Sequence, residues 1–255
     1  MKYFFFDIDG TLLSEVDHQL PDSTKRTLQL LKDHGHFIAI ATSRPYCLTT
    51  SLAKEIDILN YVCDGGDGIV IDDEIIEILP LNLQDCLELA KESIKHNILI
   101  ATSIDTTNNR YSPDHRFIET YPHLKDAFNF VTDTDFNVLE SKSIHKMCLL
   151  CKQEQEYLLP SLKKVPHYRI DEQCILVEAM YKYKGIEKMI KFINGHIDDV
   201  VVFGDGVNDI DMLKKAHMSI AMGNAKDIVK QSAKYVTDKA SEDGIYKACK
   251  HFKWI

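Results

Sequence analysis

Short apolar runs alternate with amphipathic stretches along the first eighty residues of the chain. Residues 2–8 (KYFFFDI), 36–41 (HFIAIA) and 61–63 (YVC) have the length and composition of buried strands. Residues 21–35 predict a helix that starts at a proline and ends at a glycine. Two apolar runs within residues 69–80 flank Asp-Asp-Glu, which predicts a hairpin with a turn at those acids.

The same alternation returns near the C-terminus. Residues 185–194 and 208–216 have helical spacing, and residues 199–206 and 218–223 read as strands. Two further helical stretches close the chain. Strands that alternate with helices at this spacing predict an α/β fold, with a parallel sheet covered on both faces.

The middle of the chain, residues 82–181, has a different pattern. Its predicted elements are helices at 83–94 and 153–162, strands at 98–104, 144–151 and 173–180, and a polar stretch at 108–117. This order is typical of an α+β domain. We therefore predict a discontinuous core, residues 1–81 and 182–255, with residues 82–181 inserted as a second domain.

Composition narrows the classes of partner. The 255 residues are 45% hydrophobic and carry a formal net charge of −9, so neither nucleic acid nor an anionic membrane is an expected partner. No apolar run approaches the roughly 20 residues that span a bilayer. The seven scattered cysteines suit a reducing compartment. A cytoplasmic protein is expected, as a monomer or a homodimer.

Acidic and hydroxyl side chains follow three of the predicted strands. In parallel α/β sheets, ligands bind beyond the carboxyl ends of the strands. Several carboxylates at such an edge repel one another unless a cation neutralises them, and oxygen-only ligands favour Mg²⁺. Thr11 is expected to cap the following turn rather than to contact a ligand. The side chains at the strand ends are Asp7, Asp9, Thr42, Ser43, Arg44, Asp205, Asn208 and Asp209.

Four segments in order resemble the motifs of haloacid dehalogenase-type phosphatases. They are DIDGTLL at residues 7–13, ATSRP at 41–45, Lys184-Gly185, and GDGVND at 204–209. The position of the insertion, between the second and third motifs, resembles that of the C2-type cap in the Cof-like subfamily. The resemblance implies a Rossmann-like core and an α+β cap that selects the substrate.

The resemblance also implies a role for each motif residue. Asp7 would be the nucleophile that forms an aspartyl-phosphate, and Asp9 would protonate the leaving oxygen and then activate water. Phosphate would be bound by the Thr42 hydroxyl, the Ser43 main-chain N–H and Lys184. Mg²⁺ would be held by Asp7, by the main-chain carbonyl of Asp9 and by Asp205, with Asn208 and Asp209 fixing the metal and orienting Lys184.

Residues outside the motifs leave the substrate open. Cof-like members usually have Asn-Gly-Ala where this chain has Asp64-Gly65-Gly66, so Asp64 either replaces the usual substrate contact or makes none. Arg44 either binds substrate or braces its own loop. In the insertion, Arg110, His115 and Arg116 either meet an anionic or hydroxyl-rich substrate or belong to an exposed loop.

The leading hypothesis is a Mg²⁺-dependent phosphomonoester hydrolase for small phosphorylated metabolites. Sugar phosphates come first among its expected substrates, followed by flavin mononucleotide and pyridoxal phosphate. One alternative is a phosphotransferase of the phosphomannomutase kind, which shares the DxDGT motif. The other is a non-catalytic regulator that binds phosphorylated ligands, which would have no need for a general acid beside a nucleophile.

Overall fold

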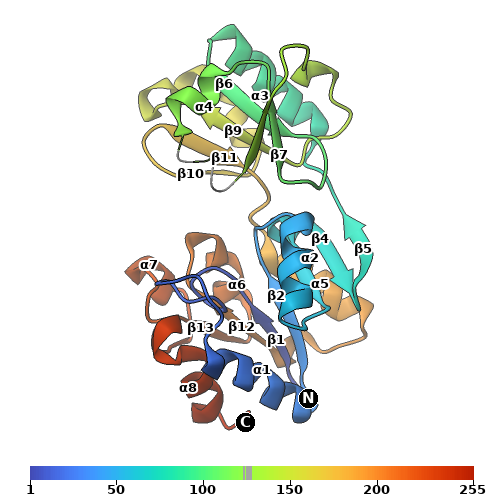
Figure 1. Ribbon diagram of the computed structural model, residues 1–255, viewed down its shortest axis with the longest axis vertical. Coiled ribbons are helices and arrows are strands. Elements are labelled where there is room, and N and C mark those ends of the chain that lie inside the picture. The colour runs from blue at the N-terminus through green and yellow to red at the C-terminus, as the bar shows by residue number, and fades with distance from the viewer. Residues whose placement is uncertain (123, 125–127) are drawn as a thin grey trace. The chain divides into compact units, whose positions relative to one another are not determined.

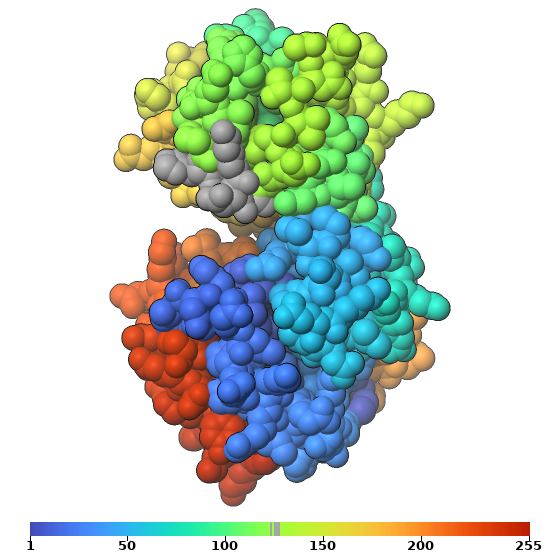
Figure 2. Space-filling model, in the orientation of Figure 1, coloured from blue at the N-terminus to red at the C-terminus, as the bar shows by residue number. Residues whose placement is uncertain are grey.

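The computed structural model describes residues 1–122, 124 and 128–255, and the chain forms two compact units (Figure 1). The core unit comprises Met1–Arg44, Thr49–Glu77 and Tyr181–Ile255. The inserted unit comprises Pro45–Leu48 and Ile78–Met180, close to the predicted insertion at 82–181. In the core unit, the blue residues of the N-terminal part pack beside the red residues of the C-terminal part (Figure 2).

An eight-stranded sheet forms the centre of the core unit. Its order is β14-β13-β12-β1-β2-β3-β4-β5, parallel from β14 to β3 and antiparallel between β3 and β4. This arrangement confirms the predicted parallel sheet. The strands are β1 (Tyr3–Phe6), β2 (Phe37–Ala41), β3 (Tyr61–Cys63), β4 (Gly68–Ile71), β5 (Glu74–Ile78), β12 (Val200–Gly204), β13 (Met218–Ala221) and β14 (Tyr235–Val236).

Helices pack on this sheet because its central strands are apolar on both faces. Successive side chains of β1 point to opposite faces, so Phe5 packs in the same cluster as Ile186 and Met189, while the ring of Phe4 contacts Trp254. The helices are α1 (Asp22–Asp33), α2 (Tyr46–Glu55), α5 (Lys182–Phe192), α6 (Ile210–Lys215), α7 (Asp227–Lys230) and α8 (Gly244–His251).

The predicted hairpin and its turn are both present. Strands β4 and β5 are neighbours in the sheet and are joined by Asp72 and Asp73, whose φ angles are 53° and 65°. Two successive residues with positive φ form the tight turn that matches the twist of a hairpin, and aspartate tolerates this conformation better than most residues.

The inserted unit has its own six-stranded sheet, in the order β10-β11-β9-β6-β7-β8. Helix α3 packs on one face through Cys86 and Leu89, and α4 packs on the other through Phe117. The elements are α3 (Leu83–Lys95), β6 (Leu99–Ser103), β7 (Asn109–Ser112), α4 (Arg116–Thr120), β8 (Asn129–Thr132), β9 (Lys146–Leu150), β10 (His167–Arg169) and β11 (Cys174–Val177).

The structure departs from the predicted elements of the insertion in two places. The helix predicted at 153–162 consists of two 3₁₀ turns, Gln153–Leu158 and Pro160–Lys164. Pro160 has no N–H to continue the first turn, and Leu159 lies outside helical backbone angles. The polar stretch at 108–117 contains strand β7 and the start of α4. No helix among the described residues is long and apolar enough to cross a bilayer.

Candidate active site

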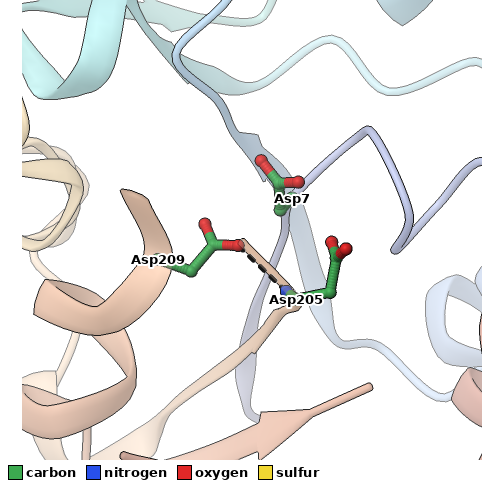
Figure 3. Close-up of side chains that lie close together, drawn as sticks. All are labelled: Asp7, Asp205 and Asp209. Carbon is green, nitrogen blue, oxygen red and sulfur yellow. Dashed lines mark hydrogen bonds between the residues drawn. The ribbon is translucent and has the colours of Figure 1, made fainter. Parts of the chain in front are cut away.

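Three carboxylates converge at the carboxyl edge of the core sheet. Asp7 directly follows β1, Asp205 directly follows β12, and Asp209 ends the short 3₁₀ turn after it (Figure 3). The main-chain N–H of Asp7 bonds to the carbonyl of Phe203, which holds the two strand ends side by side. One carboxylate oxygen from each of the three residues lies within 4.8 Å of the others. The predicted convergence of Asp7 and Asp205 is therefore present.

The lysine of this site is Lys182, and the assignment of Lys184 was wrong. Nζ of Lys182 lies 2.6 Å from Oδ1 of Asp7 and 2.6 Å from Oδ1 of Asp209, and its side chain is fully buried. Lys184, two residues further along α5, is exposed. Residues two apart on a helix point in nearly opposite directions, so only one of these lysines can reach the carboxylates.

Helical periodicity identifies the correct lysine. Counting from Lys182, positions four, seven and eight residues later are Ile186, Met189 and Ile190, which are all buried. Lys182 therefore belongs to the apolar stripe that faces the sheet. The same count from Lys184 reaches the partly buried Lys188 and the exposed Lys191, which are typical of a solvated face.

Asp209 anchors the site through both of its oxygens. Oδ1 accepts the hydrogen bond from Lys182, and Oδ2 accepts the main-chain N–H groups of Asp205 and Gly206 at 2.9 and 2.8 Å. A side chain at Gly204 would place Cβ 2.6 Å from Cγ of Asp209, so glycine is required there. Asp209 thus orients Lys182, not Lys184 as expected, and its supporting role at the metal stays a prediction.

Asp205 is held on both sides of its carboxylate. The hydroxyl of Thr11 donates to Oδ1 at 2.9 Å, and Nδ2 of Asn224 donates to Oδ2 at 3.1 Å. Thr11 therefore binds the acidic cluster, contrary to the expectation that it only caps a turn. Asn224 was not predicted, although β13 is the parallel neighbour of β12 and both strands end at the same edge of the sheet. A Cβ on Gly10 would lie 2.3 Å from Oδ2 of Asp205.

The charges of the cluster fit a divalent cation. Burial raises the pKa of Asp7, and the neighbouring Asp209 carboxylate raises it further. The same two causes raise the pKa of Asp205 to about 6. Burial opposes the charge of Lys182, but the carboxylates of Asp209 and Asp7 outweigh it and hold the pKa of this lysine above its usual value.

With all three acids ionised, three negative charges face the single positive charge of Lys182, an excess of two. The described donors around this excess are oxygen atoms, which Mg²⁺ prefers. The carboxylate of Asp209 accepts three hydrogen bonds, against two for Asp205 and one for Asp7, so Asp7 and Asp205 are the carboxylates that would hold the ion.

Asp9 and Arg44 form an ion pair. Nε of Arg44 donates to Oδ2 of Asp9 at 2.9 Å, and Nη2 donates to Oδ1 at 2.5 Å. This two-point contact uses both oxygens of the carboxylate and fixes its orientation. The side chain of Asp9 is 54% exposed, in contrast to the buried Asp7. Arg44 therefore contacts Asp9, the predicted general acid. This contact was not among the two alternatives expected for Arg44, which were substrate binding and bracing of its own loop.

The hydroxyl residues after β2 lie at the same edge. Thr42 is buried, and its hydroxyl accepts the main-chain N–H of Arg44 at 3.1 Å. The side-chain amide of Asn208 donates to the hydroxyl of Ser43 at 3.0 Å. Asn208 thus connects the loop after β12 to the loop after β2. The phosphate-binding roles of Thr42 and Ser43 stay predictions.

The predicted substrate residues lie in different environments. Asp64 is buried in the core unit at φ 48°, and its main-chain N–H bonds to the carbonyl of Arg44. Arg110 is fully buried within the inserted unit, where its guanidinium lies 4.3 Å from the ring centre of Phe128. This burial contradicts the exposed loop, one of the two expected alternatives, and contact of Arg110 with an anionic or hydroxyl-rich substrate stays a prediction. His115 and Arg116 are exposed, and Arg116 pairs with Asp114.

The chain is similar to known proteins over nearly its whole length. A model of the haloacid dehalogenase-like hydrolase family matches residues 4–249. YkrA of Bacillus subtilis (strain 168) is 29% identical over 98% of this chain and 96% of its own length. From the same organism, the 5-amino-6-(5-phospho-D-ribitylamino)uracil phosphatase YitU is 27% identical over 96% of this chain and 95% of its own.

A solved structure of a sugar phosphatase of subclass IIB is 31% identical, covers all of both chains and has a TM-score of 0.81.

Proposed function

This chain belongs to the haloacid dehalogenase-like hydrolases and is a phosphatase of that superfamily, and we propose that it hydrolyses phosphomonoesters of small metabolites with Mg²⁺ as cofactor and Asp7 as nucleophile. One observation carries the proposal: the buried Asp7 lies between a fixed cation, Lys182, and a second carboxylate, Asp205. Such an arrangement suits transfer of a phosphoryl group, whose charge must be stabilised on several sides.

In the first step Asp7 attacks phosphorus. Its Oδ1 is held by Lys182, whereas no described residue donates a hydrogen bond to Oδ2, so Oδ2 is the atom that forms the new bond to phosphorus. The ester P–O bond breaks, and the leaving oxygen takes a proton from Asp9. Mg²⁺, when bound, would neutralise negative charge on the phosphoryl oxygens.

In the second step the acyl phosphate is hydrolysed. Asp9 takes a proton from water, the water oxygen bonds to phosphorus, and the P–O bond to Asp7 breaks to release inorganic phosphate. Each oxygen of Asp9 accepts one hydrogen bond from Arg44 and keeps a second lone pair that can take the proton. Arg44 thereby controls the orientation of the general acid.

Sugar phosphates and related polyol phosphates are the proposed substrate class. The support is similarity: one relative of known structure is a sugar phosphatase, and YitU is a phosphatase for a compound that carries phosphate on a ribityl chain. Flavin mononucleotide and pyridoxal phosphate rank after these. We further propose that the inserted unit selects among them, that nucleic acid and membranes are not partners, and that the protein is cytoplasmic.

The test is phosphate release from a panel of sugar, polyol and coenzyme phosphates, with Mg²⁺ and after its removal by chelation. We expect Mg²⁺-dependent release that Asp7→Asn abolishes and that Asp199→Asn leaves unchanged, because Asp199 pairs with Lys2 at the amino end of β12. Full activity of Asp7→Asn would refute the assignment of Asp7 as the nucleophile. Transfer of phosphate to a second sugar hydroxyl instead of water would favour the phosphotransferase, and ligand binding without turnover would favour the regulator.

A further inference from the structure

We infer that Asn224 is a positioning residue that holds the Asp205 carboxylate and the Asp9–Gly10 loop in place for the divalent cation. The inference rests on the proposed function, in which Asp205 and Asp9 contribute ligands. Asn224 lies three residues after β13, in a turn closed by the hydrogen bond from the Ala225 N–H to the Met222 carbonyl at 3.0 Å. It therefore projects from the carboxyl edge of the sheet, where the acidic cluster lies.

The side-chain amide of Asn224 connects three loops. Nδ2 donates to the carbonyl of Gly10 at 2.8 Å and to Oδ2 of Asp205 at 3.1 Å, while Oδ1 accepts the main-chain N–H of Ala240 at 3.2 Å. A primary amide has two donor hydrogens, and both are used here. Because all of these contacts point in fixed directions, the orientation of the amide is determined.

These contacts determine where the Asp205 carboxylate lies. Thr11 donates to one oxygen and Asn224 to the other, so the carboxylate has a donor on each side. An ionised carboxylate oxygen accepts more than one contact, so each oxygen keeps a lone pair for a cation. Without the amide, repulsion from Asp7 and Asp209 would turn Asp205 away from the cluster whenever no cation is bound.

A neighbouring contact provides a matched control. The turn Ala240–Glu242 has two attachments. The N–H of Ala240 donates to Asn224, and Ser241 donates to Glu15 through its main-chain N–H at 3.1 Å and its hydroxyl at 2.5 Å. Ser241→Ala weakens the attachment of the same turn but removes no contact to Asp205. A role of Asn224 in loop attachment alone would be reproduced by this variant.

The experiment measures Mg²⁺ affinity by isothermal titration calorimetry, without substrate, on the folded protein. We expect Asn224→Ala to weaken binding about tenfold, in the range found when residues that orient metal ligands are removed, and Ser241→Ala to change it less than twofold. Asn224→Leu keeps the approximate size of the side chain without its polar atoms, and we expect the same loss as for Asn224→Ala. Circular dichroism at the titration temperature shows that each variant is folded.

Two results would overturn the inference in distinguishable ways. If the wild-type chain binds Mg²⁺ and both Asn224 variants bind it equally well, or if Ser241→Ala loses as much affinity as they do, Asn224 does not position the ligands. If the wild-type chain itself shows no Mg²⁺ binding, the proposed cofactor fails together with the inference.

Discussion

Replacement of Lys182 by methionine tests the electrostatic design of the site. Methionine keeps most of the length of the side chain and removes its charge, leaving the buried carboxylates of Asp7 and Asp209 with no ammonium between them. At an effective dielectric constant of about 20, two unit charges 2.6 Å apart attract one another by about 6 kcal/mol. Desolvation of the ions offsets much of this attraction, so the net effect is smaller.

Removal of one partner from a buried ion pair typically costs about 3–5 kcal/mol, and we expect a loss of that size in the free energy of unfolding of Lys182→Met without Mg²⁺. The matched control is Lys184→Met on the same helix. Its side chain is exposed, so we expect a change within about 0.5 kcal/mol. Urea denaturation of both variants measures these values.

Activity provides the second readout. Lys182 is the cation next to Asp7, the proposed nucleophile, so its loss is expected to lower kcat about 100- to 1,000-fold, as for other fixed groups that stabilise a transition state. Lys184→Met should keep near wild-type kcat. The reasoning would be refuted if Lys184→Met lost activity and stability while Lys182→Met kept both.

Two more predictions concern the carboxylates and the loop that holds them. Gly10→Ala should lower activity at least tenfold, because φ is +78° and the added Cβ would lie 2.3 Å from Oδ2 of Asp205. The control is Gly35→Ala, where φ is similar at +73° but no atom lies within 4 Å of the added Cβ. This control should lose about 1 kcal/mol of stability and no activity. Equal activity of the two variants would contradict this steric argument. The pKa of Asp205 is raised from 3.8 to about 6, so protonation of this group stabilises the metal-free fold below pH about 4, and this stabilisation is lost as the pH rises through about 6. In chelator, the unfolding free energy of the wild type minus that of Asp205→Asn should therefore fall as the pH rises from about 4 to about 6. A difference that does not change with pH would contradict the raised pKa of Asp205.

The positions of the acids could be predicted from the sequence because the parallel sheet places them. Asp7 and Asp205 follow apolar strands, and adjacent parallel strands end at one edge, so their proximity follows from the alternation of elements. The lysine was misassigned because a Lys-Gly pair was matched by its letters alone. The helical spacing of Lys182 with Ile186 and Met189 indicates that Lys182 is the lysine on the buried face of the helix.

Other contacts could not be predicted, because they depend on how loops meet in space. Asn224 follows β13, the neighbour of β12, but the contacts of its side chain with Asp205 and Gly10 depend on the path of its loop, which no local pattern specifies. An exposed loop was one of two alternatives for Arg110, because its segment is polar. Alternation along β7 instead buries Arg110 and Ser112 and leaves Asn109 and Tyr111 partly exposed.

The central claim is that Asp7 carries the phosphoryl group during turnover. The most direct measurement quenches the enzyme with acid in the first moments of its reaction with a sugar phosphate and locates the phosphoryl group by peptide mass spectrometry. The account predicts one phosphoryl group on the peptide that contains Asp7, present with Mg²⁺, absent after chelation and absent from Asp7→Asn. Phosphate release with the phosphoryl group on another residue, or undiminished release by Asp7→Asn, would contradict it.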